Sequence, residues 1–405
     1  THFKGSFKGH PDKKHIVGFC AACTHLTGVE VIHNCPLYCL LGTLCGTSPG
    51  VCQARLQDHT DFDGPFIRAE PSKRGRKKKQ DSPCHTTNDD ESDLESKYPN
   101  TIVRVPKIAV IGTDEFDDFM ITNNLWKIAF DKKKSDRSII RAFLKGSLSK
   151  NLRSTLKNYL GSIKFPIAVR SSSLLEDSQY QPLAGMYSTY MLPNKNKSKS
   201  HRLEELEKAI KLVYASTFLN EPKTLIEASV HHHEEEKMAV IIMELVGKKH
   251  GDIFYPSASG LAQSFNYYPT SYMKRNEGVA YLALGLGRTI AEGEKSLRFA
   301  PKYPGLIPQY YSVRSTVDNS QNQFYALDLN KGGDLLKNSQ FENTSLYDLS
   351  TAENDGELFW SGSVVSNSDN TIRDNLKDAG TRVITFPSVL KWNSAPVMEL
   401  IIDLL

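Results

Sequence analysis

The sequence predicts an α+β fold built from more than one lobe. Apolar, β-branched runs of strand length lie between stretches whose apolar residues recur every three or four positions. The two patterns are interleaved without the regular strand–helix–strand repeat of a parallel sheet, which is α+β in character. The 405 residues are 39% hydrophobic and 24% charged, so the composition is globular and the length fits two or three domains.

The elements of the folded region follow from local patterns. Residues 102–111 predict a strand that Pro106 interrupts. Thr113 fits a helix N-cap, with Asp114 and Glu115 in the first turn, where the helix dipole favours negative charge. Later helices are expected at 139–160 and 202–218, and later strands at 165–169, 238–246, 261–268 and 278–284.

The N-terminal segment differs from this pattern. It shows no period of 2 or 3.6, and it closes with a basic block at 73–79 and a polar, acidic run at 81–95, which together indicate a solvated linker. We therefore expect an irregular or disordered segment over residues 1–92 and a folded domain over 93–405. All seven cysteines lie in this first segment, at Cys20, Cys23, Cys35, Cys39, Cys45, Cys52 and Cys84.

A zinc site in this segment remains one of the open interpretations. The positions of Cys20, Cys23, Cys35 and Cys39 resemble zinc-ligand spacing, although the second pair is separated by three residues and the gap between the pairs is short. Disorder and an error in the gene model are the alternatives, and the second would fit a chain that begins with Thr1 rather than Met. We expect the chain to be a fragment.

The net charge and the positions of the cysteines argue against a nucleic-acid-binding, membrane or secreted protein. The net charge of +4 is too small for this length to indicate binding to nucleic acid or to a membrane. No run approaches the roughly 20 apolar residues that a membrane helix needs. Secreted proteins usually spread disulfides through their domains, and the residues after Cys84 contain no cysteine. We therefore expect a cytoplasmic protein without a membrane partner.

The first chemical signal is an arginine followed by hydroxyl side chains. The apolar strand predicted at 165–169 runs directly into Arg170, Ser171 and Ser172. A guanidinium offers a planar fork of donors for phosphate oxygens, and neighbouring hydroxyl and backbone N–H groups can complete an anion site. A capping serine beside a surface arginine is the alternative.

Two further segments add a glycine turn and a buried carboxylate. Gly185 would let the backbone approach a triphosphate closely, although a simple turn also explains it. Glu244 stands inside the apolar run at 238–246, where a carboxylate costs free energy unless it is paired. A purine amine, a bound cation, or a nearby Lys or Arg would provide that pairing.

The last segment, at 285–293, combines a glycine turn with Arg288 and Glu292. It does not match the dinucleotide fingerprint, because the third glycine is misplaced and no helix-opening pattern follows. A glycine turn, a cation and a carboxylate together suit a magnesium nucleotide.

In this order the four segments resemble the ATP-binding domain of the phosphoenolpyruvate synthase and pyruvate phosphate dikinase family. The resemblance implies an ATP-grasp-like fold, with nucleotide between a first lobe at about 98–200 and a second at 201–300, and a loosely matched remainder at 301–405. The stretches that carry it are 169–177, 183–185, 243–246, 259–262 and 285–293.

The resemblance also implies a set of site residues. Arg170 would be catalytic and hold the β- and γ-phosphates, and Glu244 with its neighbours would form the hinge beside adenine. Glu292 would bind Mg²⁺. The residues implied to bind ATP are Arg170, Ser171, Ser172, Ala184, Gly185, Met243, Glu244, Val246, Gly287 and Arg288.

The function implied by the resemblance is phosphotransfer. A phosphoenolpyruvate synthase-like kinase would pass the β-phosphoryl group of ATP to a histidine on a phosphohistidine domain, in the same full-length protein or in trans. Pyruvate would be reached only through domains that this chain lacks. A glucan or antibiotic hydroxyl as the acceptor, and a non-catalytic regulatory module that binds ATP, are the alternatives.

The sequence also departs from the family pattern. The Gly-Gly-Lys-Gly segment expected shortly before Tyr98 is absent, so the phosphate-binding lysine has no counterpart there. Arg288 replaces the carboxylate of Gly-Leu-Gly-Glu, and Tyr281 replaces an acidic residue. The missing lysine and the change to Arg288 favour the non-catalytic alternative.

Overall fold

The expected α+β class is confirmed by the computed structural model, in which helices pack against several antiparallel sheets. The structure describes residues 15–17, 97–98, 101–103, 106–131, 133–173, 187–220, 222, 237–331, 344–394 and 396–404. The cysteines and the Ala184–Gly185 turn lie outside these residues, so the zinc and glycine-turn expectations are not tested.

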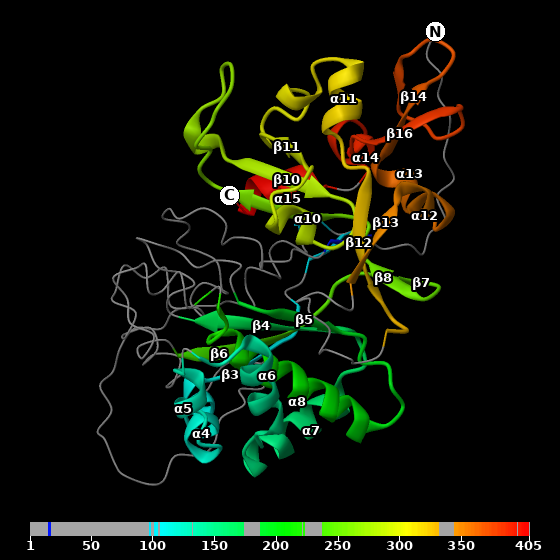
Figure 1. Ribbon diagram of the computed structural model, residues 1–405. Coiled ribbons are helices and arrows are strands. Elements are labelled where there is room, and N and C mark those ends of the chain that lie inside the picture. The colour runs from blue at the N-terminus through cyan, green and yellow to red at the C-terminus, as the bar shows by residue number, and fades with distance from the viewer. Residues whose placement is uncertain are drawn as a thin grey trace.

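The first lobe is a four-stranded antiparallel sheet covered on one face by helices (Figure 1). The strand order is β3 (Ile108–Ile111), β6 (Met238–Glu244), β4 (Ile167–Ser173) and β5 (Thr189–Leu192). The helices of the lobe are α4 (Thr113–Thr122), α5 (Trp126–Ala129), α6 (Asp136–Lys145), α7 (Lys150–Ser162) and α8 (Lys199–Ser216).

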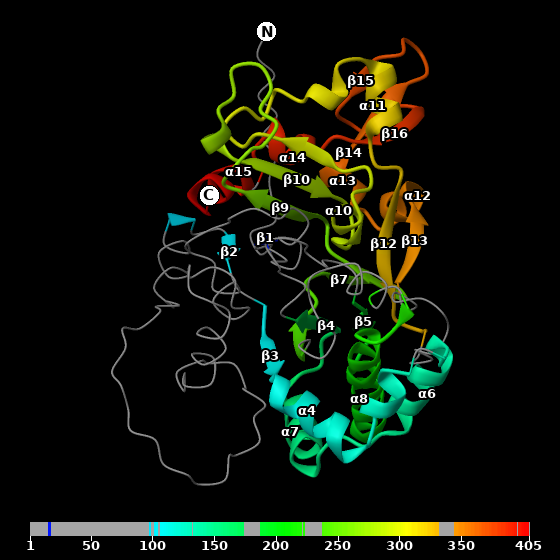
Figure 2. The same ribbon diagram turned by 60° about the vertical axis from the view of Figure 1, so that its left-hand side comes forward.

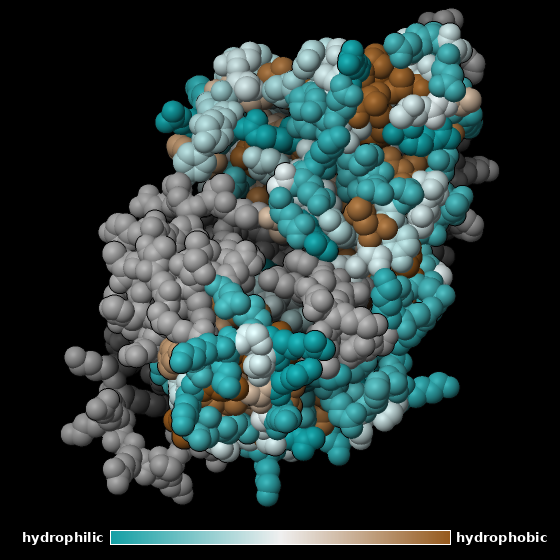
Figure 3. Space-filling model, viewed as in Figure 1, coloured by the Kyte–Doolittle hydropathy of each residue, from teal (hydrophilic) through white to brown (hydrophobic). Residues whose placement is uncertain are grey.

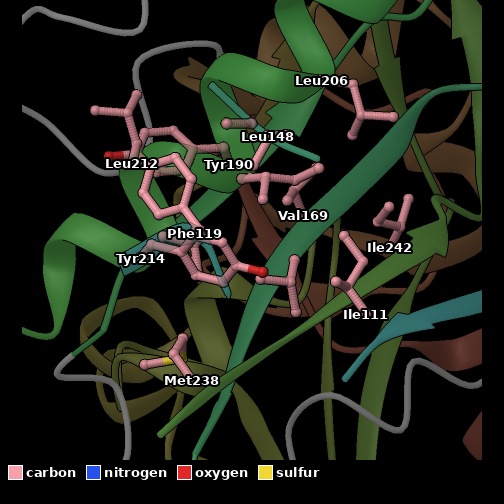
Figure 4. Packing of buried hydrophobic residues seen from close by; sticks show 14 of the residues in the cluster. Ile111, Phe119, Leu148, Val169, Tyr190, Leu206, Leu212, Tyr214, Met238 and Ile242 are labelled. Atoms are coloured by element: carbon pink, nitrogen blue, oxygen red, sulfur yellow. The ribbon is translucent and has the colours of Figure 1, made fainter. Parts of the chain in front are cut away.

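Side chains on opposite faces of this sheet enter different apolar clusters. Ile167 and Val169 of β4 belong to the large core under the helices, whereas Ala168 belongs to a separate cluster. Because strand side chains alternate, Arg170 lies on the side of Ala168, away from the helices. Figure 4 shows Val169 in the helix-side core with residues from β3, β6 and α8.

Helix ends in this lobe depend on short-range signals. Helix α4 begins at Thr113, but its N-cap is Gly112, so the expected cap residue was wrong by one position. The helix expected at 139–160 is two helices. Helix α6 ends at Lys145, and its C-cap Gly146 has an extended backbone. Helix α7 begins at Lys150 after the N-cap Ser149, whose hydroxyl accepts a hydrogen bond from Leu152 N at 3.1 Å.

The second lobe contains three further sheets with short helices around a second core that spans residues 253–401. Its strands are β7 (Lys248–His250), β8 (Ile253–Tyr255), β9 (Ser259–Gln263), β10 (Val279–Ala283), β11 (Leu297–Phe299), β12 (Gln323–Asp328), β13 (Thr344–Asp348), β14 (Gly362–Ser366), β15 (Ile372–Arg373) and β16 (Gly380–Ile384). The sheet orders are β13-β12-β8-β7, β11-β10-β9 and β15-β14-β16.

The remaining elements are a pair of short strands near the N-terminus and the helices of the second lobe. Strands β1 (His15–Val17) and β2 (Thr101–Val103) pair in parallel. The helices of the second lobe are α10 (Arg288–Ala291), α11 (Val313–Asn319), α12 (Leu349–Asn354), α13 (Leu358–Ser361), α14 (Pro387–Leu390), α15 (Val397–Leu404) and the short 3₁₀ turns η3 (Arg275–Glu277) and η4 (Pro308–Tyr310).

The two cores divide the chain after β6. Buried residues of α8 and β6, such as Leu206 and Ile242, pack in the same core as residues from β3 and β4, so the first core includes residues on both sides of position 200. The second core begins at Ile253. Figure 2 shows the lobes one above the other, with β7 at the level between them.

The face seen in Figure 3 is largely hydrophilic, with smaller apolar areas over both lobes. Within the described ranges, no helix combines the length and the apolar character that a bilayer crossing requires.

Burial of Glu115 gives a pH-dependent prediction. This residue is 2% exposed, Ser149 Oγ donates to its Oε2 at 3.0 Å, and its Oε1 has no hydrogen-bond partner among the described residues. Burial raises the pKa of Glu115, so the folded state loses stability as pH rises through that pKa. Glu115→Gln should therefore stabilise the protein at neutral pH and have a smaller effect below the ordinary glutamate pKa of about 4.3.

The measurement is the free energy of unfolding in urea at a series of pH values. Glu204→Gln is the control for loss of one carboxylate. The Glu204 side chain is 71% exposed and its contact with His201 is 4.0 Å long, so its loss should give a much smaller pH dependence. A Glu115→Gln effect that does not increase between acidic and neutral pH would contradict this account.

Candidate functional site

The two lobes meet over an apolar layer that we call the interlobe cluster. It is formed by residues that are each no more than 8% exposed, and partly buried Met191 packs against it. Its members are Ala168, Leu245, Phe254, Leu286, Tyr325, Leu327 and Leu329. Because the first-lobe residues Ala168 and Leu245 pack here against second-lobe residues, this layer positions the polar groups at its edge.

The chain crosses between the lobes at residues 245–247, which we call the hinge segment. Glu244 N donates to Lys107 O and Leu245 N donates to Pro166 O, both at 2.9 Å, so the segment begins firmly attached to the first lobe. At its other end Gly247 lies against β8. A Cβ atom on Gly247 would be 2.8 Å from the backbone carbonyl carbon of Tyr255, which leaves no room for a side chain.

The side chain of Glu244 faces the helices rather than the interlobe cluster. It follows Ile242 in the alternation along β6, and its Oε2 accepts a hydrogen bond from Lys107 N at 3.3 Å. Burial raises the pKa of Tyr159 on α7 to about 12, and the charge of Glu244 adds to this shift. The Glu244 side chain is therefore not placed to contact adenine at the hinge, and Glu244 N already donates to Lys107 O.

Met243 lies on the other side of β6. In the strand register it is opposite Ala168, and the next residue on its side of the chain is Leu245 of the interlobe cluster. Val246 follows within the hinge segment. The structure therefore brings Met243 and Val246, both expected at the adenine site, to the boundary between the lobes.

Arg170 and Ser172 share the face of β4 that carries Ala168. Strand β4 continues through Ser173, beyond the end expected at residue 169. In the register Arg170 is opposite Thr189 on β5 and Ile241 on β6, and it is half-buried. Ser171 is 8% exposed and alternates onto the helix side, so the structure does not bring its hydroxyl to the same face as Arg170.

The second lobe contributes residues 285–294, which we call the glycine loop. Gly285 has a φ of +83°, and a Cβ atom there would be 2.7 Å from Tyr325 O. Leu286 N donates to Tyr325 O at 2.9 Å, which attaches the loop to β12. Gly287 is the N-cap of the short helix α10, although the sequence shows no helix-opening pattern there.

Arg288 of the glycine loop is held by an aromatic ring and a carboxylate. Its guanidinium carbon Cζ is 4.3 Å from the ring centroid of Tyr325, a cation–π arrangement, and its Nε donates to Glu292 Oε1 at 2.8 Å. Tyr325 OH donates to Glu294 Oε1 at 2.8 Å, and burial together with this bond raises the pKa of Tyr325. The arginine is therefore fixed at the edge of the interlobe cluster.

Two arginines from different lobes thus border the same apolar layer. Arg170 is the next residue after Ala168 on its side of β4, and Arg288 lies over Tyr325. Guanidinium groups beside a layer from which water is excluded attract phosphate strongly, because the local dielectric is low. The arrangement suits a polyphosphate bound between the lobes.

The described residues do not fit a divalent metal ion centred on Glu292. Its Oε1 is paired with Arg288, and Oε1 of the neighbouring Glu294 accepts from Tyr325. Within the described ranges, no three His, Cys, Asp or Glu residues are grouped so that they could hold a metal ion.

Sequence reasoning missed Tyr325 and Glu294. Both act on Arg288 through contacts that local patterns do not reveal, since Tyr325 belongs to β12 and is distant from the glycine loop in the chain. The sequence signal at Tyr325 is an aromatic residue within the apolar run 323–328. Such a residue is equally typical of an ordinary core strand, so it does not indicate a contact with Arg288.

A comparison with protein-family models identifies the family. Residues 92–355 match the model described as the AMP/ATP-binding domain of pyruvate phosphate dikinase, which covers more than half of the chain. The chain belongs to this family. The matched stretch of this dikinase-family domain includes both lobes' arginines, Arg170 and Arg288, and the whole glycine loop. A search of curated proteins finds no match.

Gly285 should be required for the position of the glycine loop. Any residue other than glycine at positive φ costs about 1–2 kcal/mol of stability, and at Gly285 the Cβ atom would also displace the backbone of Tyr325. Gly285→Ala should therefore lower the free energy of unfolding by more than Gly293→Ala does. Gly293 is a matched control, because its φ is +69° but nothing lies within 4 Å of its Cβ position.

Urea denaturation of the two variants measures this difference directly. Equal losses of stability would mean that the glycine loop is not packed against β12 as described.

Proposed function

We propose that residues 93–405 form the nucleotide-binding half of a dikinase-type phosphotransferase, with ATP held between the two lobes. Membership of the AMP/ATP-binding family supplies the nucleotide class. The observation that carries the location is the pair of arginines, Arg170 and Arg288, from different lobes at the edge of the interlobe cluster. We place the adenine beside the hinge segment and the phosphates between the two guanidinium groups.

The hinge segment suits adenine because apolar side chains lie on its interlobe side. Leu245 is a member of the interlobe cluster, and Met243 on β6 precedes it on the same side. Backbone N–H and C=O groups in such a segment can bind the edge of a purine while apolar side chains cover its ring. The Ala184–Gly185 turn would then cover the triphosphate, as the family resemblance implies.

Arg170 is the residue to which we assign the catalytic role. Charge accumulates on the transferring phosphoryl group and on the leaving phosphate oxygen, and a fixed guanidinium stabilises both. A histidine nitrogen on a phosphohistidine domain would attack the β-phosphorus, and the bond from that phosphorus to the α-phosphate oxygen would break. AMP leaves, and the γ-phosphate is subsequently lost to water or to phosphate, which leaves a phosphohistidine.

The final acceptor proposed is pyruvate, as in phosphoenolpyruvate synthase, reached through domains outside this chain. The same nucleotide site would serve a glucan or an antibiotic hydroxyl equally well. The cysteine-free sequence after Cys84 favours a cytoplasmic location for this reaction.

One observation favours a second candidate, a regulatory module that binds ATP without transferring phosphate. Arg288 stands at the position of the family's Gly-Leu-Gly-Glu carboxylate, and it is paired with Glu292. An arginine in place of a carboxylate can still attract the phosphates of ATP, because its charge is positive. It cannot perform the role of the carboxylate in phosphoryl transfer.

Removal of the Arg170 guanidinium should weaken ATP binding without unfolding the protein. We expect Arg170→Ala to lose about 1.5–3 kcal/mol of ATP affinity, the scale of hydrogen bonds to a charged group, and to leave adenosine affinity unchanged. Calorimetric titration with ATP and with adenosine measures both. Arg314→Ala is the control, because the Arg314 side chain is 93% exposed on α11. A fall in melting temperature with unchanged ATP affinity would show that Arg170 is structural.

The phosphotransfer step can be tested with ATP labelled in the β-phosphoryl group. The chain is incubated with this ATP and with an isolated phosphohistidine domain from a dikinase. We expect label on the histidine of that domain and none when Arg170→Ala is used. ATP binding without transfer of label would instead support the regulatory alternative.

A further inference from the structure

We propose that the Arg288 guanidinium acts as the built-in counter-charge for the nucleotide phosphates, in place of a divalent cation held by the protein. The inference rests on the proposed function, because it takes the phosphates to lie beside the glycine loop. It predicts that this chain binds metal-free ATP at least as well as the magnesium complex.

Arg288 is already held in place by its neighbours before any ligand binds. Its side chain is 20% exposed, its Cζ lies 4.3 Å from the ring centroid of Tyr325, and the hydroxyl of that tyrosine is anchored on Glu294. A stacked arginine with a fixed Nε contact loses little further side-chain entropy when a phosphate arrives. It is therefore preorganised in the way that a bound metal ion would be.

The nearby carboxylates of Glu292 and Glu294 each already accept a hydrogen bond from another side chain. A divalent cation bound by Glu292 would have to lie next to the guanidinium that is already 2.8 Å from Glu292 Oε1. The two positive charges would repel each other in a partly buried site, where screening by water is weak. Glu294 Oε1 already accepts a hydrogen bond from Tyr325 OH, which makes this carboxylate a weaker partner for a cation.

The charge of the ligand then decides which form binds better. Metal-free ATP carries a larger negative charge than its magnesium complex, so a site whose counter-charges are two arginines attracts the free form more strongly. Glu292 opposes this attraction, because its carboxylate and the phosphates compete for the same guanidinium. Removing the charge of Glu292 should therefore tighten the binding of free ATP.

The experiment is calorimetric titration of the full chain with ATP, once in excess EDTA and once in excess MgCl₂. We expect the Kd in EDTA to be equal to or lower than the Kd in MgCl₂. Arg288→Gln should raise the Kd in EDTA by about tenfold or more, which corresponds to about 1.4 kcal/mol, and should raise the Kd in MgCl₂ less. Glu292→Gln should lower the Kd in EDTA.

Arg288→Glu provides a test in the opposite direction. It places a second carboxylate one helical turn before Glu292, so ATP binding by this variant should require magnesium. Arg314→Gln is the control for a change in net charge and should alter neither Kd, because its side chain is 93% exposed on α11.

Binding of ATP by the unmodified chain only in MgCl₂ would overturn the inference and leave the proposed function intact. Loss of magnesium-dependent binding in Glu292→Gln would do the same, since it would make Glu292 the metal ligand. An absence of ATP binding in both buffers by a folded chain would overturn the proposed function as well.

Discussion

The interlobe cluster is the contact on which the rest of the structure depends. Ala168 of β4 and Leu245 of the hinge segment pack there against second-lobe residues such as Leu327, which is fully buried. Burial of apolar area stabilises such a layer by about 25 cal/mol per Å². Because β4 also supplies the helix-side core through Val169, one strand couples the two packing layers. The position of β4, which carries Arg170, relative to the second lobe is therefore set by apolar packing.

Charged side chains lie at the edge of the interlobe cluster. Partial burial removes water from the Arg288 charge and costs free energy, and the stacking of Arg288 on Tyr325 and its pairing with Glu292 offset that cost. Both interactions are also the ones that an incoming polyphosphate must share or displace. The same pair of side chains therefore links the stability of the glycine loop to its function, and it distinguishes this chain from the carboxylate pattern that the family resemblance implies.

Sequence reasoning succeeded where a regular apolar pattern marks an element, and it failed at helix ends and at contacts between residues that are distant in the chain. The strand at 238–244 and the helix at 199–216 follow from unbroken apolar patterns. The division of the predicted helix at 139–160 was missed, because the apolar spacing continues past Gly146 while the helical backbone ends there. Arg170 and Arg288 were found from their motifs, but which face of β4 holds Ser171, and which ring holds Arg288, became visible only from the strand register and from β12.

The central claim is that one ligand engages both lobes across the interlobe cluster. Amide hydrogen exchange of the full chain, followed by mass spectrometry with and without saturating ATP, tests it most directly. The account predicts slower exchange in β4, in the hinge segment at 245–247 and in the glycine loop at 285–294, with no change in α7 or α11. Protection confined to one lobe, with the other lobe unchanged, would contradict the claim.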